Sequence, residues 1–206
     1  MLTVGNNRAG VEELLGNGLL PCPGCGGRLG GWGHAARRLV FAAGRVAVAV
    51  RPRRARCCSC GVTHVLLPAW LLSRRCDGTA VIGEMLARAA RGQGFRKIAA
   101  ASGVPEGTVR GRLRRFRGSA GRVREFFTRL AGVLAPDPVP LDPAGSVLGD
   151  AVVAVAAAAA AARGRWPGMV TVSGWELAAV LTLGSLLSPV ACFACVRDGL
   201  PGSALA

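Results

Sequence analysis

Tyrosine is missing from this sequence of 206 residues, and lysine occurs only once, at Lys97. The 26 basic side chains are therefore almost all arginines, and 11 acidic side chains leave a formal net charge of +15. The absence of tyrosine beside abundant Ala, Gly and Arg is typical of translated high-GC bacterial DNA. The shortage of acidic side chains favours a polyanionic partner, either a nucleic acid or an anionic membrane surface.

We expect no secretory signal peptide at the start of the sequence. Residues 1–18, MLTVGNNRAGVEELLGNG, contain no basic segment followed by an apolar run. We therefore expect a cytoplasmic, nucleoid-associated protein. Stable disulfides are rare in the cytoplasm, so clustered cysteines there favour metal binding.

Charged side chains are distributed unevenly along the sequence. Residues 88–129 hold 12 basic and 2 acidic side chains, whereas residues 130–206 hold 3 basic and 5 acidic ones. Near the change, residues 135–146 contain four prolines, which lack the N–H that helices and central strands need. We predict a linker over 135–146 and a domain boundary there.

Cysteines, by contrast, are clustered. Cys22 and Cys25 form one C-x-x-C pair, Cys57 and Cys60 form another, and a glycine follows each pair. Zinc prefers four soft ligands in a tetrahedron, and each C-x-x-C turn brings two thiolates to one ion. The two pairs predict one Zn²⁺ site with four thiolate ligands.

Between the two pairs, valines alternate with other residues within 45–57, which is the period of a strand. We predict strands over 37–42 and 45–57 around a break at 43–44, within a zinc ribbon that spans 18–68. A thioredoxin-like redox pair is the alternative, but it needs a βαβ setting, which the sequence does not show.

Three further residues are not among the four predicted zinc ligands and need an interpretation of their own. His64 follows Cys60 at C-x-x-x-H spacing and could replace one thiolate, or it could pack or contact a phosphate. Cys58 points away from the metal if Cys57 and Cys60 both bind it. Cys76 is interpreted as an unpaired small apolar residue.

Residues 79–117 predict three helices. An apolar stripe from Val81 ends near Gly92, FRKIAAAS (95–102) forms a second helix, and a third follows Pro105. Ala99, Gly103 and Val109 have the spacing of a helix-turn-helix motif, whose second helix enters the DNA major groove. We predict such a domain over 78–130, with helix 106–117 reading DNA.

Arginine dominates the exposed face of helix 106–117. Arg110 and Arg114 are placed to bond guanine edges, and the other polar side chains are placed to contact phosphates. Close approach of the backbone to DNA would explain Gly107 and Gly111, and loose selection at these positions is the alternative. The predicted DNA-binding residues are Arg96, Lys97, Thr108, Arg110, Arg112, Arg114, Arg115 and Arg117. The alternative is an arginine-rich amphipathic helix in another kind of helical domain.

The segments CPGC…RCCSCGVTHVLLPAWLL and GFRKIAAASGVPEGTVRGRLRRF together resemble the N-terminal recognition region of bacterial insertion-sequence transposases. They are also similar to short high-GC bacterial proteins that carry only these two modules. The resemblance covers about residues 20–130 and implies DNA binding by the basic helix and zinc ligation by the four cysteines. Arg112 departs from it, because similar sequences carry a bulky apolar residue near this position.

A catalytic domain is not expected. A transposase nuclease domain needs three spaced carboxylates for two divalent metals, and about 60 residues after the linker are too few for one. Neither a Ser/His/Asp set nor a glycine-rich phosphate loop is evident, so we expect no enzyme activity.

The C-terminal region 147–206 is apolar and predicted to be helical, with an alanine-rich run at 151–166. Residues 177–196 carry no charge and are long enough to cross a membrane; a buried helical hairpin or a dimer contact is the alternative. Cys192 and Cys195 form a third C-x-x-C pair, which we expect to be buried.

Taken together, the sequence predicts an α+β fold, mainly α, that binds Zn²⁺ and double-stranded DNA. A homodimer is compatible with the apolar tail. Two alternatives are a membrane-tethered DNA-binding or signalling protein anchored by 177–196, and a zinc ribbon that binds protein or RNA.

Overall fold

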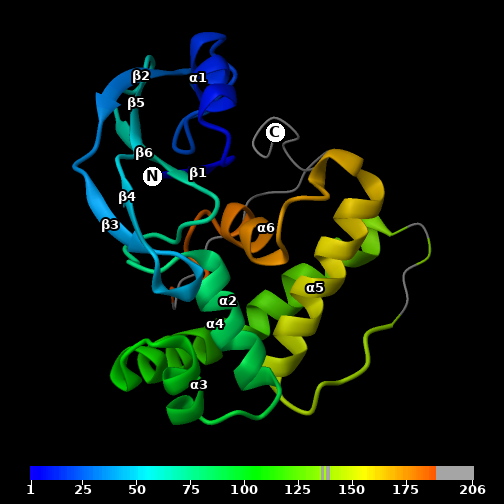
Figure 1. The fold of residues 1–206 in the computed structure, drawn as a ribbon. Coiled ribbons are helices and arrows are strands. Elements are labelled where there is room, and N and C mark those ends of the chain that lie inside the picture. The colour runs from blue at the N-terminus through cyan, green and yellow to red at the C-terminus, as the bar shows by residue number, and fades with distance from the viewer. Residues whose placement is uncertain (136, 138–139, 189–206) are drawn as a thin grey trace.

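The computed structural model describes residues 1–135, 137 and 140–188. About 49% of it is helix and 18% strand, which confirms the predicted α+β class. In Figure 1 the strands of residues 1–68, in blue to cyan, form one lobe, and the long helices after residue 79 form the other.

A mixed four-stranded sheet in the order β1-β6-β5-β2 forms the first lobe. Its strands are β1 (Leu2–Val4), β2 (Leu29–His34), β5 (Arg53–Cys57) and β6 (Thr63–Pro68). β1 runs parallel to β6, and the other neighbours are antiparallel. Helix α1 (Arg8–Gly16), whose first turn is capped by the Asn7 side chain, buries Val11 and Leu15 in the core of this lobe. Both β1 and α1 precede residue 18, so this lobe begins earlier than the predicted ribbon.

The hairpin expected between the cysteine pairs is present as strands β3 (Arg38–Phe41) and β4 (Ala47–Val50). The break expected at 43–44 is the 3-10 turn η1 (Ala43–Arg45), where Gly44 has a φ of 66° that glycine adopts without steric cost. The strand expected over 45–57 is two strands, β4 and β5, which belong to different sheets. Pro52 lies between them and lacks the N–H that a continuous ladder needs.

Three helices open the second lobe: α2 (Thr79–Ala90), α3 (Phe95–Ser102) and α4 (Glu106–Leu134). Helix α3 has the predicted bounds. Helix α4 continues well past residue 117, because Ala120, Val123 and Phe127 extend the same apolar face.

The C-terminal region adds helix α5 (Val147–Arg165), the 3-10 turn η2 (Pro167–Met169) and helix α6 (Gly174–Leu181). Helix α5 lies along α4 (Figure 1) and buries Ala154, Ala158 and Ala162 in the core that the helices share. The described part of 135–146 contains neither helix nor strand, yet the helices on both sides of it belong to one hydrophobic cluster.

The uncharged segment 177–196 is not a single helix in its described part. Helix α6 ends at Leu181, and positive φ values at Leu183 (50°) and Gly184 (72°) turn the chain away from the helix axis. Leu186 and Leu187 then enter the helical core. Residues 189–196, with the third C-x-x-C pair, lie outside the described residues.

One described helix, Val147–Arg165, is long and apolar enough to cross a membrane, judged by length and composition alone. In the structure 44% of its most apolar window is buried against other parts of the chain. Because the core helix of a globular domain passes the same test, this helix gives little support to a membrane span.

Candidate metal centre and nucleic-acid interface

The four cysteines of the first two C-x-x-C pairs come together at one end of the four-stranded sheet. Cys22 and Cys25 precede β2, whereas Cys57 ends β5 and Cys60 lies in the turn to β6. Their Sγ atoms all lie within 4.8 Å of one another, with 3.8 Å from Cys22 to Cys60 and 3.5 Å from Cys25 to Cys57. A tetrahedral ion about 2.3 Å from each sulfur sets its ligands about 3.8 Å apart. The cluster can therefore hold a metal ion.

The glycine after each pair shapes the loop that presents the thiols. Gly26 and Gly61 both have a φ of 72°, where a side chain would be strained. Their N–H groups donate to the carbonyl oxygens of Cys22 and Cys57, at 2.8 and 3.1 Å. Each loop is thus closed by its own backbone, which fixes the direction of both thiols in the pair.

Two thiols of the cluster differ in acidity. The backbone N–H groups of Cys60 and Ser59, both 3.4 Å from the Cys57 Sγ, lower the pKa of Cys57 from 9.0 to about 6 despite the opposing effect of burial. The backbone N–H of Gly27 acts to lower the pKa of Cys25, but the neighbouring thiols of Cys57 and Cys60 outweigh it and raise that pKa to about 12. Negative charge on one sulfur opposes ionisation of the next, so a cation is needed for four thiolates, and its binding releases protons.

His64 lies beside the cluster but is not one of its four members. Its side chain is buried, with Nε2 3.4 Å from the Cys22 Sγ and Nδ1 3.2 Å from the amino group of Met1. Burial, and then the positive amino group, lower the pKa of His64. The neutral ring can accept at Nδ1 and donate from Nε2–H to the sulfur. This is the geometry of a residue that supports a metal ligand.

Two more described cysteines lie outside the cluster: Cys58 in the turn between Cys57 and Cys60, and Cys76 in the loop before α2. Cys58 and Cys76 are both exposed. The side chain of Cys58 lies on the Gly30 side of the turn, as expected if its neighbours face the metal. The Cys76 thiol lies 3.6 Å from the Asp77 carboxylate, so it has a polar partner and is not the unpaired apolar residue that the sequence suggested.

Helices α3 and α4 meet through a tight turn. Gly103 ends α3 with a φ of 65°, in the left-handed region, and Val104 fills the space beneath the turn, with 3% of its surface exposed. Ala99 and Val109, at the predicted contact positions, are buried. The small side chain of Ala99 lets the two helices approach, and Val109 anchors the first turns of α4.

Seven of the eight residues predicted to bind DNA have exposed side chains. They are Arg96, Lys97, Thr108, Arg110, Arg114, Arg115 and Arg117. Successive residues lie about 100° apart around a helix, so Arg110 and Arg117 share one flank of α4, and Thr108 and Arg115 share the other. Arg96 of α3 lies 3.9 Å from Glu106 on the Arg110 flank. Both flanks of the exposed face therefore carry positive charge.

Arg112 is the exception, and the prediction that it contacts DNA is wrong for this conformation. Its side chain is 4% exposed and forms an ion pair with Asp77, and its other terminal nitrogen lies 3.6 Å from the Met85 sulfur. The helical spacing explains this position, because residue 112 falls between Val109 and Phe116 on the buried face. The buried face of α4 therefore contains a charged side chain with a charged partner.

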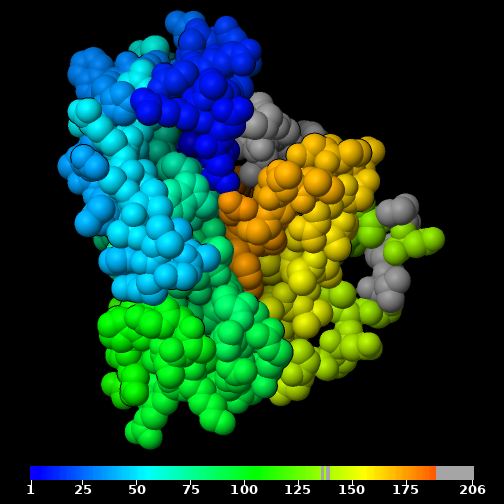
Figure 2. All heavy atoms as spheres, in the orientation of Figure 1, coloured from blue at the N-terminus to red at the C-terminus, as the bar shows by residue number. Residues whose placement is uncertain are grey.

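Asp77 is the important residue that sequence reasoning missed. It is 1% exposed and accepts from two arginines, Arg112 of α4 and Arg45 of the β3–β4 turn, the latter at 2.7 Å. The aliphatic part of Arg45 lies over Gly103, where an added Cβ would be 3.2 Å from its Cγ. In Figure 2 the hairpin, in light blue, rests directly on the green helices. Asp77 thus connects the first lobe to the turn between α3 and α4.

An exposed tryptophan and a neighbouring arginine lie beside the cysteine cluster. Trp32 is 50% exposed, and the Arg56 guanidinium lies 4.9 Å from the centroid of its ring. These side chains and the Cys57–Gly61 turn line a shallow hollow. The arrangement offers an aromatic face and a positive charge next to the metal centre.

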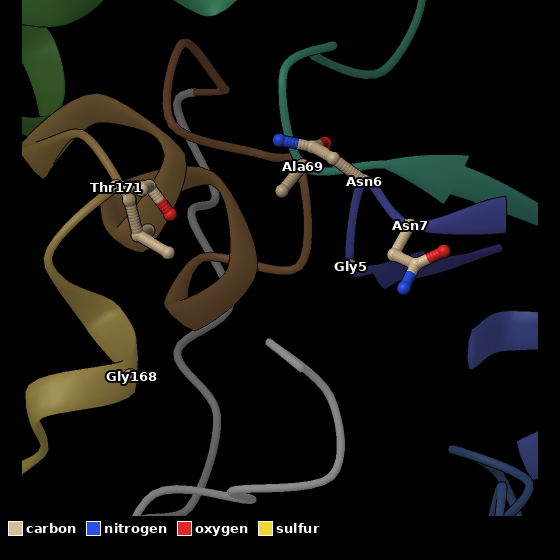
Figure 3. A pocket seen from close by; sticks show the side chains of 7 residues that line it. Gly5, Asn6, Asn7, Ala69, Gly168 and Thr171 are labelled. Carbon is tan, nitrogen blue, oxygen red and sulfur yellow. The ribbon is translucent and has the colours of Figure 1, made fainter. Parts of the chain in front are cut away.

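A further hollow lies between the lobes, where the loop after β1 faces η2 and the loop before α6. Figure 3 shows Asn6 and Ala69 on one side of it, and Gly168 and Thr171 on the other. Asn6 spans the seam, since its Nδ2 donates to Glu176 at 2.6 Å and its Oδ1 accepts from the Trp70 N–H at 3.1 Å. The lining carries no charged side chain, so we interpret this hollow as part of the joint between the lobes.

These features describe an α+β protein with a four-cysteine centre and a basic helix. Comparison with known families finds a domain of unknown function (DUF6431), whose family model matches residues 22–104. The match begins at the first cysteine of the cluster and ends at the turn before α4. No curated protein and no solved structure matches the chain.

Proposed function

We propose that the chain is a non-catalytic DNA-binding protein, in which a zinc ribbon precedes a helix-turn-helix that reads duplex DNA through residues 106–117. The observation that carries the proposal is the pair of helices α3 and α4, joined at a left-handed Gly103 and basic on both exposed flanks. In helix-turn-helix proteins the second helix lies in the major groove with its first residues at the base edges. The resemblance to transposase recognition regions implies the same role.

The mechanism has two stages. Arginines on both flanks of α4, together with Arg96 and Lys97 of α3, attract the phosphate backbone and position the helix. Arg110 and Arg114 then form bidentate bonds to guanine O6 and N7 in the groove. Gly107 has no atom within 4 Å of where a Cβ would lie, so the backbone of α4 can come close to DNA there.

Zinc is the ion we propose for the cysteine cluster. Four thiolates in a closed tetrahedral set, with no position left for a substrate, are typical of structural zinc sites. The ion would tie the loop before β2 to the β5–β6 turn. By this means it would hold the hairpin and Arg45 against Asp77 and the turn before α4.

Selection of bound duplexes from a random pool, with zinc-loaded full-length protein, tests the proposal. We expect a preferred site, and log affinity should fall linearly with log salt concentration. Arg110→Ala and Arg114→Ala should each weaken the preferred site by about 1–3 kcal/mol and relax base preference there. Arg165→Ala, an exposed arginine at the end of α5, is the control. An equal loss on all sequences would exclude base reading by Arg110 and Arg114.

A second candidate function is favoured by Trp32 alone. An exposed aromatic face with a stacked arginine suits the stacking of an unpaired base, so the ribbon could bind single-stranded RNA. Trp32→Ala should then weaken RNA binding and leave duplex binding unchanged, as measured by fluorescence anisotropy. We do not propose membrane anchoring through 177–196, because its described part is a short helix and a buried turn.

A further inference from the structure

A hollow next to the first turns of α4 is built almost entirely from arginine and glycine. Its floor includes Gly107 and Gly111, one turn apart on α4. Its walls include Arg115 of α4 and two arginines, Arg74 and Arg75, from the loop between β6 and α2. These two arginines lie about 30 residues ahead of the basic helix in the sequence, and only the fold brings them to its surface.

Of the five arginines that line the hollow, four lack counter-charges within the part of the chain that the structure describes, and the fifth, Arg112, pairs with Asp77. None of the ion pairs there includes Arg74, Arg75 or Arg115. The nearby carboxylate of Asp77 already accepts from two other arginines, Arg45 and Arg112. The hollow therefore concentrates positive charge from four arginines that form no ion pair with an acidic side chain of the described residues.

The surroundings of Arg75 are unfavourable for its positive charge. Its Nε atom is buried and has no hydrogen-bond partner in the described structure. Burial, followed by the positive charges of Arg115 and Arg112, lowers the pKa of Arg75. A donor that is both desolvated and repelled by its neighbours gains from an anion placed against it.

The backbone of α4 adds to the attraction. The hollow reaches the first turn of the helix at Gly107 and Thr108, and no side chain caps that end. The first N–H groups of a helix, and its dipole, favour negative charge there. At Gly111 the absence of a side chain leaves room for Arg115, whose Nη1 would be 3.3 Å from an added Cβ.

We propose that this hollow seats a phosphate group of the DNA backbone on the Thr108–Arg115 flank of α4. The assignment rests on the proposed function and deepens it, because it makes the loop at 74–75 a phosphate contact and leaves base reading to the centre and opposite flank of the helix. Free orthophosphate offers the same chemistry, so the test must separate the two sources.

The test uses the zinc-loaded full chain and two probes, inorganic phosphate and a random-sequence duplex. Arg75→Gln and Arg115→Gln remove one charge each from the hollow, and Arg117→Gln removes one from the opposite flank. Gly111→Ala narrows the floor and should not harm folding, because alanine is the better helix former. Gly118→Ala is its matched control, on the same helix with nothing near the added Cβ. Circular dichroism and thermal unfolding verify that each variant folds.

We expect saturable phosphate binding, detected in every protein by the backbone amide NMR signal of Thr108, which lines the hollow, and also by the Nε–Hε signal of Arg75 where that residue is kept. Arg75→Gln, Arg115→Gln and Gly111→Ala should weaken it about tenfold, the two controls leaving it unchanged. On the duplex, each hollow arginine variant should lower affinity about tenfold and reduce the salt slope by about 1.

The remaining outcomes separate this inference from the proposed function. If the wild type binds the duplex and the hollow variants bind it equally well, the phosphate seat is overturned and DNA binding stands. If the wild type binds no duplex but orthophosphate binds in the hollow, the bound phosphate group does not come from DNA. The proposed function is then refuted as well. If neither probe responds to the hollow variants, the site itself is refuted.

Discussion

The two lobes of the molecule are held together by different means. The larger hydrophobic cluster described in the first lobe contains nine buried residues, and two of them, Cys22 and Cys57, belong to the cysteine cluster. The helical lobe has a cluster of 29 described buried residues, which runs from Leu72, just before α2, to Leu187, after α6. Small apolar cores need a staple such as a metal or a disulfide. The comparison therefore leads us to expect that the first lobe depends on an ion held by the cysteine cluster and the second on packing.

Removal of the metal should have the largest effect. We expect it to unfold the first lobe and to leave the helical lobe folded. A structural zinc ion contributes about 10–16 kcal/mol of apparent binding energy in small zinc domains, more than any single side chain. Chelation, or Cys25→Ser, should abolish metal binding and unfold β2, β5 and β6, while α4 and α5 keep most of their protection from hydrogen exchange. Metal analysis and exchange measured by NMR check this.

Cys58→Ser is the control for that prediction, because this exposed thiol lies within the same turn and outside the cluster. It should bind one metal ion as the wild type does. Retention of a full equivalent of metal by Cys25→Ser would refute the ligand assignment, and simultaneous loss of exchange protection in both lobes would contradict their independence.

Asp77 should give the next largest effect, because it joins the lobes. Asp77→Ala leaves the Arg112 guanidinium buried without a counter-charge, and the loss of one partner of a buried pair costs about 3–5 kcal/mol. Urea unfolding of the metal-loaded protein measures the change. The double variant Asp77→Ala/Arg112→Leu should recover most of the loss, since position 112 belongs to an apolar face. A double variant as unstable as the single one would mean that Arg45 accounts for the role of Asp77.

Packing within the helical lobe can be tested at Gly83. A Cβ at this position on α2 would lie 2.1 Å from Cδ1 of Trp175 on α6, so the ring or the helix must move. Gly83→Ala should therefore destabilise the protein by about 1–3 kcal/mol, read as a lower midpoint of thermal unfolding. Gly121→Ala, with open space around it, should stabilise α4 by up to about 1 kcal/mol. Equal responses at the two positions would show that the fit around Trp175 is loose.

Local patterns predicted some parts of this molecule well. The C-x-x-C spacing identified all four cysteines of the cluster, and the bounds of α3 followed from its apolar stripe and from Gly103. Both signals lie within a few residues of the feature they predict, so no knowledge of the tertiary fold was needed.

Features that depend on distant parts of the chain were missed. The parallel pairing of β1 with β6 joins residues more than 60 positions apart, such as Leu2 and Leu66. Arg112 looked like a surface charge because its partner Asp77 lies in another segment of the chain. The apolar period of α4 places position 112 on the buried face. The prediction followed the charge of arginine instead and placed it on the surface. A charged residue in an apolar stripe is therefore a reason to search for a buried partner.

The smallest effect is expected at His64, and it separates support of the metal centre from ligation. His64→Phe keeps a flat ring but removes the Nε2–H donor 3.4 Å from the Cys22 sulfur. Loss of such an outer partner lowers metal affinity about 10–100-fold, and we expect the lower end, because the three other sulfurs are unaffected. Competition with a zinc chelator measures the affinity. His34→Phe is the control, since its Nε2 has no partner in the described structure. If His64→Phe lost the metal altogether, as a cysteine variant should, the ring would be a ligand and the four-thiolate assignment would have to change.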